Sequence, residues 1–202
     1  MKFHRSMLSI AAVMLVSAVG YAQNHAEMQK EPAPKSDMHK SAEPAPSDAQ
    51  KSFEALKTLA GTWGGNLTTD PKNPEMENAH PQVTLRVTSR GNAIVHEMKE
   101  AGTPEDPAKY DHPVTMLYVD SGRLTLVHYC DAGNRPRMAA KVSPDGKKVE
   151  FEFQDLSGGN EYGHMHHAVF TVIDENHHTE DWTYMMPGDK PMQVHMDLKR
   201  AQ

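Results

Sequence analysis

The chain has 202 residues and a formal net charge of −6, from 27 acidic and 21 basic side chains. No stretch concentrates lysine and arginine, which argues against a nucleic-acid partner, because binding to phosphates needs a dense basic surface. The single cysteine, Cys130, cannot form an intramolecular disulfide, so a hydrophobic core has to stabilise the fold without covalent cross-links.

The N-terminal segment has the order of features found in a secretory signal peptide. Lys2 and Arg5 precede an apolar run over residues 7–19, and small residues stand at Gly20 and Ala22. The run is too short for a membrane-spanning helix, which needs about 20 apolar residues. We therefore predict a signal peptide over residues 1–22, cleavage after Ala22, a periplasmic or secreted location, and no integral membrane segment after cleavage.

Residues 23–47 have the composition of a disordered linker. They contain two Ala-Pro pairs and mixed charges, but no aromatic or β-branched side chain. Such a segment cannot bury enough apolar surface to offset the entropy lost on ordering. The sequence therefore predicts a Pro/Ala-rich linker before a folded domain over residues 48–202.

The domain is predicted to begin with one short amphipathic helix. Phe53, Leu56 and Leu59 recur at helical spacing after Ser47, which is a good capping residue. Gly61 is a natural helix stop. We expect this helix over about residues 49–60.

From Gly61 onward the apolar residues alternate with polar ones at a period of two, which is typical of β-strands. Tight-turn residues separate ten such segments. A single antiparallel up-and-down barrel with a helical cap suits this pattern, and polar residues on one side of several strands favour a barrel with an internal cavity over a packed sandwich. The predicted strands cover residues 62–67, 83–87, 93–98, 114–119, 124–130, 138–142, 149–153, 164–173, 177–186 and 192–199.

The segment Gly61-Thr62-Trp63 resembles the opening of the calycins, which include the lipocalins, the fatty-acid-binding proteins and the haem-binding nitrobindins. Gly61 and Trp63 match their Gly-x-Trp motif, in which the tryptophan packs across the closed end of the barrel. Residues 128–138 are also similar to a stretch of uncharacterised bacterial lipocalin-like proteins. The resemblance covers about residues 50–200 and implies a barrel with an internal cavity, but it does not identify a ligand.

A candidate ligand-binding cluster surrounds the predicted turn after residue 130. Arg135 and Arg137 flank a proline, and two arginines beside a turn are able to hold a carboxylate or phosphate. The same residues also suit a hairpin loop with solvated arginines. The ligand-binding prediction also takes in His128, Tyr129, Asn134 and Trp182. For Trp182, core packing is the default explanation.

These residues predict an exported protein that binds a small, hydrophobic or amphipathic molecule with a polar or anionic end. The histidines give an alternative. His164, His166, His178 and His195 lie on three predicted strands, and converging imidazoles would bind a transition metal, or one of them a haem. Scattered surface histidines would explain the same pattern.

A third hypothesis is an enzyme with a Cys-His pair. His128 and Cys130 are two residues apart on a predicted strand and therefore share a side. A thiolate beside an imidazole is a nucleophile arrangement, but a lone cysteine is more often packed.

Overall fold

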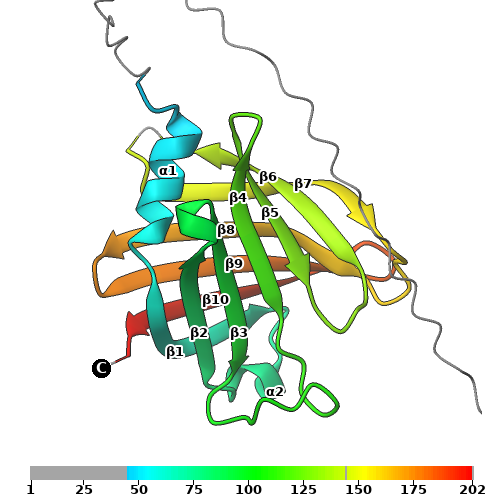
Figure 1. Ribbon diagram of the computed structural model, residues 1–202. Helices are drawn as coiled ribbons and strands as arrows, with labels where there is room; N and C mark the ends of the chain where they lie inside the picture. Colours follow the sequence, from blue (N-terminus) through cyan, green and yellow to red (C-terminus); the bar gives the residue numbers. More distant parts are fainter. Residues whose placement is uncertain (1–44, 144, 202) are drawn as a thin grey trace, which may run out of the picture. The chain divides into compact units, whose positions relative to one another are not determined.

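The computed structural model describes residues 45–143 and 145–201. The predicted signal peptide and the linker up to residue 44 lie outside the described residues. The described part forms a closed ten-stranded antiparallel barrel, shown in Figure 1. Its elements are α1 (Asp48–Lys57), β1 (Gly61–Asp70), α2 (Pro74–Glu77), β2 (Pro81–Thr88), the 3₁₀ turn η1 (Ser89–Gly91), β3 (Ala93–Glu100), β4 (Val114–Asp120), β5 (Arg123–Tyr129), β6 (Arg135–Val142), β7 (Lys148–Ser157), β8 (His164–Asp174), β9 (His177–Met186) and β10 (Lys190–Arg200).

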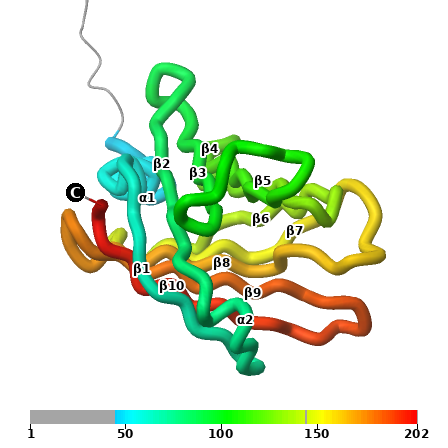
Figure 2. The backbone as a smooth tube through the Cα atoms, turned by 90° about the horizontal axis from the view of Figure 1, so that it is seen from below, coloured from blue at the N-terminus to red at the C-terminus, as the bar shows by residue number. Residues whose placement is uncertain are grey.

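Each strand pairs with its neighbours in the chain, and β1 pairs with β10 to close the ring. Figure 2 shows these two strands side by side along the barrel wall. Closure gives every strand a hydrogen-bonded neighbour on both sides, which is how an up-and-down barrel avoids open sheet edges. The predicted all-β barrel, its ten strands and its N-terminal helix are confirmed. Neither α-helix of the described chain is long and apolar enough to cross a membrane.

Helix α1 closes one end of the barrel. The Ser47 side chain caps it by accepting a hydrogen bond from the Gln50 backbone, 3.2 Å long. Its apolar face carries Phe53 and Leu56, and both are buried in the core that the strands enclose. The helix ends at Lys57 rather than at residue 60, because turn-type hydrogen bonds from residue i to i−3 take over at Thr58.

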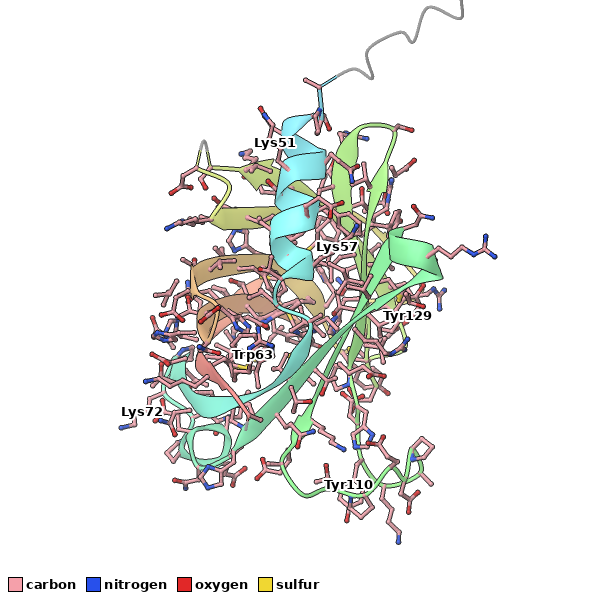
Figure 3. All side chains as sticks on the ribbon, turned by 60° about the vertical axis from the view of Figure 1, so that its left-hand side comes forward. Lys51, Lys57, Trp63, Lys72, Tyr110 and Tyr129 are labelled. Atoms are coloured by element: carbon pink, nitrogen blue, oxygen red, sulfur yellow. The ribbon has the colours of Figure 1, made fainter. Side chains whose placement is uncertain are left out.

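Trp63 fills the barrel just below α1, as Figure 3 shows. It is fully buried, and its Nε1 donates a 2.8 Å hydrogen bond to the Leu59 carbonyl. The Arg200 guanidinium lies 4.2 Å from the centre of the indole and donates to the Thr58 and Ala60 carbonyls. Gly61 has φ +142°, and a Cβ there would meet Arg200 at 2.4 Å. Gly61 and Trp63 therefore have the structural positions that the Gly-x-Trp resemblance implied.

Candidate functional site

A row of polar side chains crosses the inner wall of the barrel. His96 on β3, Thr115 on β4 and His128 on β5 are successive cross-strand partners, and all three are buried. Alternation along each strand puts these residues on the inner face at one level of the barrel. Thr115 Oγ1 and His128 Nδ1 share a 2.8 Å hydrogen bond. A continuous polar band is therefore built into the hydrophobic interior.

The centre of this polar band is Glu180, which reaches in from β9 and is fully buried. Its carboxylate accepts hydrogen bonds from His96 Nε2 at 2.9 Å, from His178 Nε2 at 3.0 Å and from Trp182 Nε1 at 2.9 Å. Burial by itself would raise the pKa of the Glu180 carboxyl, but the attraction of His96 and the hydrogen bonds from both histidines hold the pKa below its ordinary value. Glu180 is thus an ionised carboxylate with three N–H donors around it.

His128 is a neutral imidazole in the same band. Burial, together with the nearby His96, lowers its pKa to about 4. The centre of the Trp182 ring lies 5.6 Å from the centre of the His96 imidazole and 5.7 Å from that of His128. The Nδ1 atoms of His96 and His178 are buried and have no hydrogen-bond partner in the described chain.

Trp182 also lines a pocket of about 300 Å³ at the end of the barrel that carries α2, the end opposite α1 in Figure 1. The lining is apolar except for Lys99, Glu100 and Asp111, and four of the lining side chains are methionines from α2, β3, β8 and β10. The lining residues are Leu67, Met76, Ala79, Pro81, Met98, Lys99, Glu100, Asp111, Pro113, Met165, Trp182, Val194 and Met196. The interior therefore has a packed half under α1, a polar band, and an open half lined by thioethers.

The predicted ligand-binding cluster does not form as expected. His128 and Trp182 are inside the barrel, but Arg135, Arg137 and Tyr129 are exposed. The Arg135 guanidinium donates to Ser157, and that of Arg137 forms an ion pair with Asp155. The reason is that β6 begins at Arg135, so alternation directs the buried Pro136 inward and both arginines outward.

Asn134 has a structural position in the same segment. It is buried, and its amide donates to the carbonyls of Gly159 at 3.0 Å and Gly163 at 2.7 Å. These bonds tie the turn before β6 to the loop between β7 and β8. The structure places Asn134 away from the pocket lining.

The four histidines predicted as a metal site fall in three places. In the interior, His178 Nε2 is hydrogen-bonded to the Glu180 carboxylate. His164 Nε2 shares a 3.1 Å hydrogen bond with His166 Nδ1. His195 lies on the outer face, 2.6 Å from Asp181. No three His, Cys, Asp or Glu side chains of the described residues are placed to hold a metal ion. The set therefore does not make one site.

The interior also does not fit a haem, because none of the pocket-lining residues is a histidine. A haem held by an axial histidine would need a free imidazole facing the cavity. The described lining of this pocket therefore offers no imidazole as an axial ligand.

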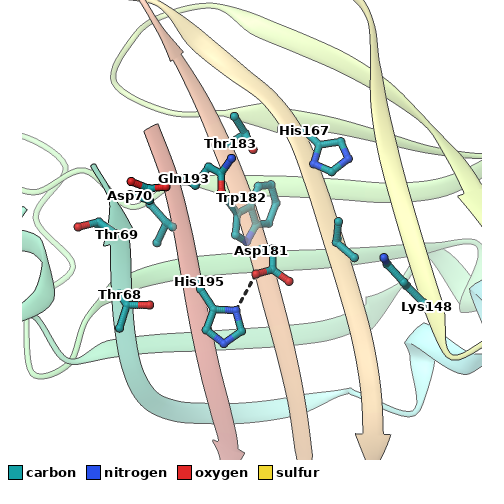
Figure 4. A pocket seen from close by; sticks show the side chains of 12 residues that line it. Thr68, Thr69, Asp70, Lys148, His167, Asp181, Trp182, Thr183, Gln193 and His195 are labelled. Carbon is teal, nitrogen blue, oxygen red and sulfur yellow. Dashed lines mark hydrogen bonds and ion pairs between the residues drawn. The ribbon is translucent and has the colours of Figure 1, made fainter. Parts of the chain in front are cut away.

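A second pocket, of about 330 Å³, lies on the outer face of the barrel and is shown in Figure 4. It includes the His195–Asp181 pair, with Thr68 and Thr183 beside it. Asp181 and Thr183 alternate with the inward Glu180 and Trp182 along β9, and His195 precedes the inward Met196 on β10, so these polar side chains lie on the other side of the barrel wall from the interior pocket. Trp182 and Val194 line both pockets.

The structure gives no support to a Cys-His nucleophile. Cys130 is half-buried, and burial together with the nearby Asp111 and Asp131 carboxylates raises the pKa of its thiol. A raised pKa disfavours the reactive thiolate. The hydrogen bond of His128 goes to Thr115 instead.

Glu180, His96 and the methionine pocket were not predicted from the sequence. For Glu180 the signal was present: Trp182 was expected to face inward, and positions 178 and 180 share its side of the strand. For His96 and the pocket there was no comparable signal, since their partners lie on distant strands.

No family model and no curated protein matches this sequence. Among solved structures, the barrel is similar to the crystal structure of Rv2717c from M. tuberculosis, with a TM-score of 0.53 and 14% identity over 75% of this chain and 98% of that one. A protein of unknown function from the DUF3598 family of Nostoc punctiforme PCC 73102 has 10% identity over 72% of this chain and 48% of that one, with a TM-score of 0.38. At such identities the first likeness shows the fold alone. The chain is a closed ten-stranded antiparallel barrel, consistent with a calycin-like architecture.

Proposed function

We propose that this protein binds a small, largely apolar molecule in the methionine-lined pocket that Trp182 helps to line. The observation that carries the proposal is an apolar pocket at one end of a closed barrel whose other end is sealed by α1 and Trp63. A volume of about 300 Å³ is at the low end of ligand pockets. The ligand is therefore smaller than a long-chain fatty acid. Methionine side chains are flexible and polarisable, so they adapt to irregular apolar shapes.

The charges around the pocket favour a neutral or cationic polar end over an anionic one. The arginines that suggested an anionic group are on the outer face. The carboxylates Glu100 and Asp111 line the pocket, whereas the ammonium of Lys99 is paired with Glu105. An anionic group would meet two carboxylates and no free cation among the lining side chains.

Export is part of the same proposal. The basic start, the short apolar run and the small residues before position 23 support a protein that acts in the periplasm or outside the cell.

The binding proposal is tested with a neutral, environment-sensitive naphthalene dye and its sulfonated analogue. We expect the neutral dye to bind in a saturable way and to change the fluorescence of Trp182. Val194→Phe fills the pocket and should abolish this binding. Gln193→Phe adds the same ring one residue earlier, on the outer face, and should leave it unchanged. Absence of dye binding by the unmodified protein, or equal binding by Val194→Phe, would refute the proposal. Tighter binding of the sulfonated dye would refute the charge preference.

A further inference from the structure

The pairing between β1 and β2 stops well before β1 ends. The two strands are paired only from Gly61↔Leu85 to Gly64↔Gln82, whereas β1 continues to Asp70 and remains paired with β10 along its length. Residues 65–70 therefore pair with β10 alone, at the end of the barrel where the interior pocket lies. Leu67, in this stretch, lines the pocket. The hydrogen-bonded wall is open here, and another segment has to cover it.

The segment that covers this part of the wall is residues 71–80, which we call the strap, with α2 at its centre. Figure 1 shows α2 at the open end of the barrel, beside β1. Met76 and Ala79 of the strap line the interior pocket. None of the four residues of α2 is buried. Segments with few buried contacts open at the lowest cost in free energy, so the strap is the part of the pocket wall that opens most easily.

The strap is held against β1 by hydrogen bonds between Glu77 and Thr69. Glu77 Oε1 accepts from the Thr69 backbone N–H at 3.0 Å and from the Thr69 hydroxyl at 3.1 Å. Thr69 Oγ1 in turn accepts from the Asn73 backbone N–H at 2.7 Å. The carboxylate thus takes the place of the β2 partner that the Thr69 amide lacks. We call these bonds the latch.

The neighbouring segments are joined to the barrel by backbone pairing instead. Pro113 also lines the pocket, but its carbonyl accepts from the Met98 N–H at 3.0 Å, which continues the pairing of β3 with β4. The C-terminal end of the strap is fixed to the end of β3 in a similar way, by the 2.8 Å bond from the Ala101 N–H to the His80 carbonyl. Between this fixed end and β1, the latch is made by side chains.

We propose that the strap is a gate. When the latch breaks, the strap swings away from the wall between β1 and β2, and the ligand enters and leaves the interior pocket through this opening. The gate rests on the proposed function for its ligand, but its movement is measurable without one.

Acrylamide quenching of tryptophan fluorescence in the full-length protein reports the gate directly. Trp182 lines the pocket behind the strap, whereas Trp63 is buried under α1 at the other end of the barrel. Glu77→Ala removes two hydrogen bonds to a charged group, so the population of the open strap should rise at least about tenfold. We expect stronger quenching of Trp182 and at least about tenfold faster amide hydrogen exchange over residues 71–80.

Two further variants make the test specific. Thr69→Val removes the hydroxyl from the other side of the latch and should act in the same direction, and its effect should not add to that of Glu77→Ala in the double variant. Glu75→Ala is the matched control. It makes the same change of charge on α2, but Glu75 is exposed and its carboxylate forms no hydrogen bond or ion pair with the described residues.

Unchanged quenching of Trp182 in both Glu77→Ala and Thr69→Val overturns the inference, even where the strap exchanges faster. An equal increase in Glu75→Ala overturns it too. Amides of β9 should exchange as slowly as in the unmodified protein; if they quicken as much as the strap, the variants unfold globally and the gate fails.

The naphthalene dye separates the gate from the proposed function. The latch variants should bind and release the dye faster at similar affinity, because loss of the latch destabilises the closed strap equally with and without ligand. If the dye binds at unchanged rates, the gate fails and the proposed function stands. If the dye never binds while the latch variants expose Trp182 to acrylamide, the proposed function fails and the opening of the strap stands.

Discussion

Replacement of Glu180 by leucine should destabilise the barrel by a large fraction of its total stability. The change leaves three buried N–H groups, on His96, His178 and Trp182, without their acceptor. An unsatisfied buried donor costs about 1–3 kcal/mol, so the three together cost roughly 3–9 kcal/mol. The whole free energy of unfolding of a domain is typically about 5–15 kcal/mol.

Glutamine at position 180 should cost less, and the structure shows why. Glu180 Oε1 accepts from His178, Oε2 accepts from Trp182, and His96 lies within hydrogen-bond distance of both oxygens. If the new amide nitrogen takes the place of Oε1, His178 is able to accept from it by changing its tautomer. Trp182 and His96 then keep the remaining oxygen. We expect a loss of about 1–3 kcal/mol, from the missing charge in these bonds.

The measurement is urea unfolding followed by far-UV circular dichroism and tryptophan fluorescence. The matched control is Asp181→Leu, the neighbouring carboxylate on the outer face, which is half-exposed and should change the free energy of unfolding by no more than about 1 kcal/mol. The reasoning is refuted if Glu180→Leu unfolds within about 1 kcal/mol of the unmodified protein, or if glutamine costs as much as leucine.

The remaining predictions concern four other positions. The pKa of His128 falls from 6.5 to about 4 on folding, so the unfolded chain takes up the proton at a higher pH than the folded protein does. The free energy of unfolding should therefore decline by about 3 kcal/mol as the pH falls from 6.5 to 4. A pH series of urea unfolding curves should lack this decline in His128→Gln. Trp63→Ala should cost about 3–5 kcal/mol, measured as a lower unfolding midpoint, and an unchanged midpoint would contradict its placement. Arg135→Ala should leave both the melting temperature and dye binding unchanged, because its side chain is exposed. Export in a Gram-negative host should give a periplasmic protein that begins at Gln23 by mass spectrometry, and a retained residue 1–22 segment would rule out cleavage after Ala22.

The barrel was predictable because its information is local. A period of two and tight turns located all ten strands to within a few residues, and Ser47 located the start of α1. The elements α2 and η1 have four and three residues, too few to show any period. Their positions depend on how the barrel closes, which the sequence pattern does not express.

The functional side chains were harder to predict, for two different reasons. The hydrogen bond between His96 and Glu180 joins residues 84 positions apart, so only ring closure brings them together. The error at Arg135 was local. The predicted strand begins only at residue 138, which leaves both arginines in the loop before it. In the structure β6 starts three residues earlier, at Arg135, and alternation along the strand directs both arginines outward.

The polar band raises the question of what a buried carboxylate does in a small barrel. Replacing a buried ionic group and its partners by well-packed apolar residues is often neutral or stabilising, so stability alone does not account for it. Glu180 does hold the Trp182 indole, whose Nε1–H donates a 2.9 Å hydrogen bond to the carboxylate. That indole lines the pocket, and Met196, the cross-strand partner of Glu180, lines it as well. The carboxylate therefore orients the base of the pocket. Glu180→Gln keeps an oxygen for Trp182 Nε1 and should leave ligand binding unchanged in the dye titration, so a large loss of binding in this variant would contradict the orienting role.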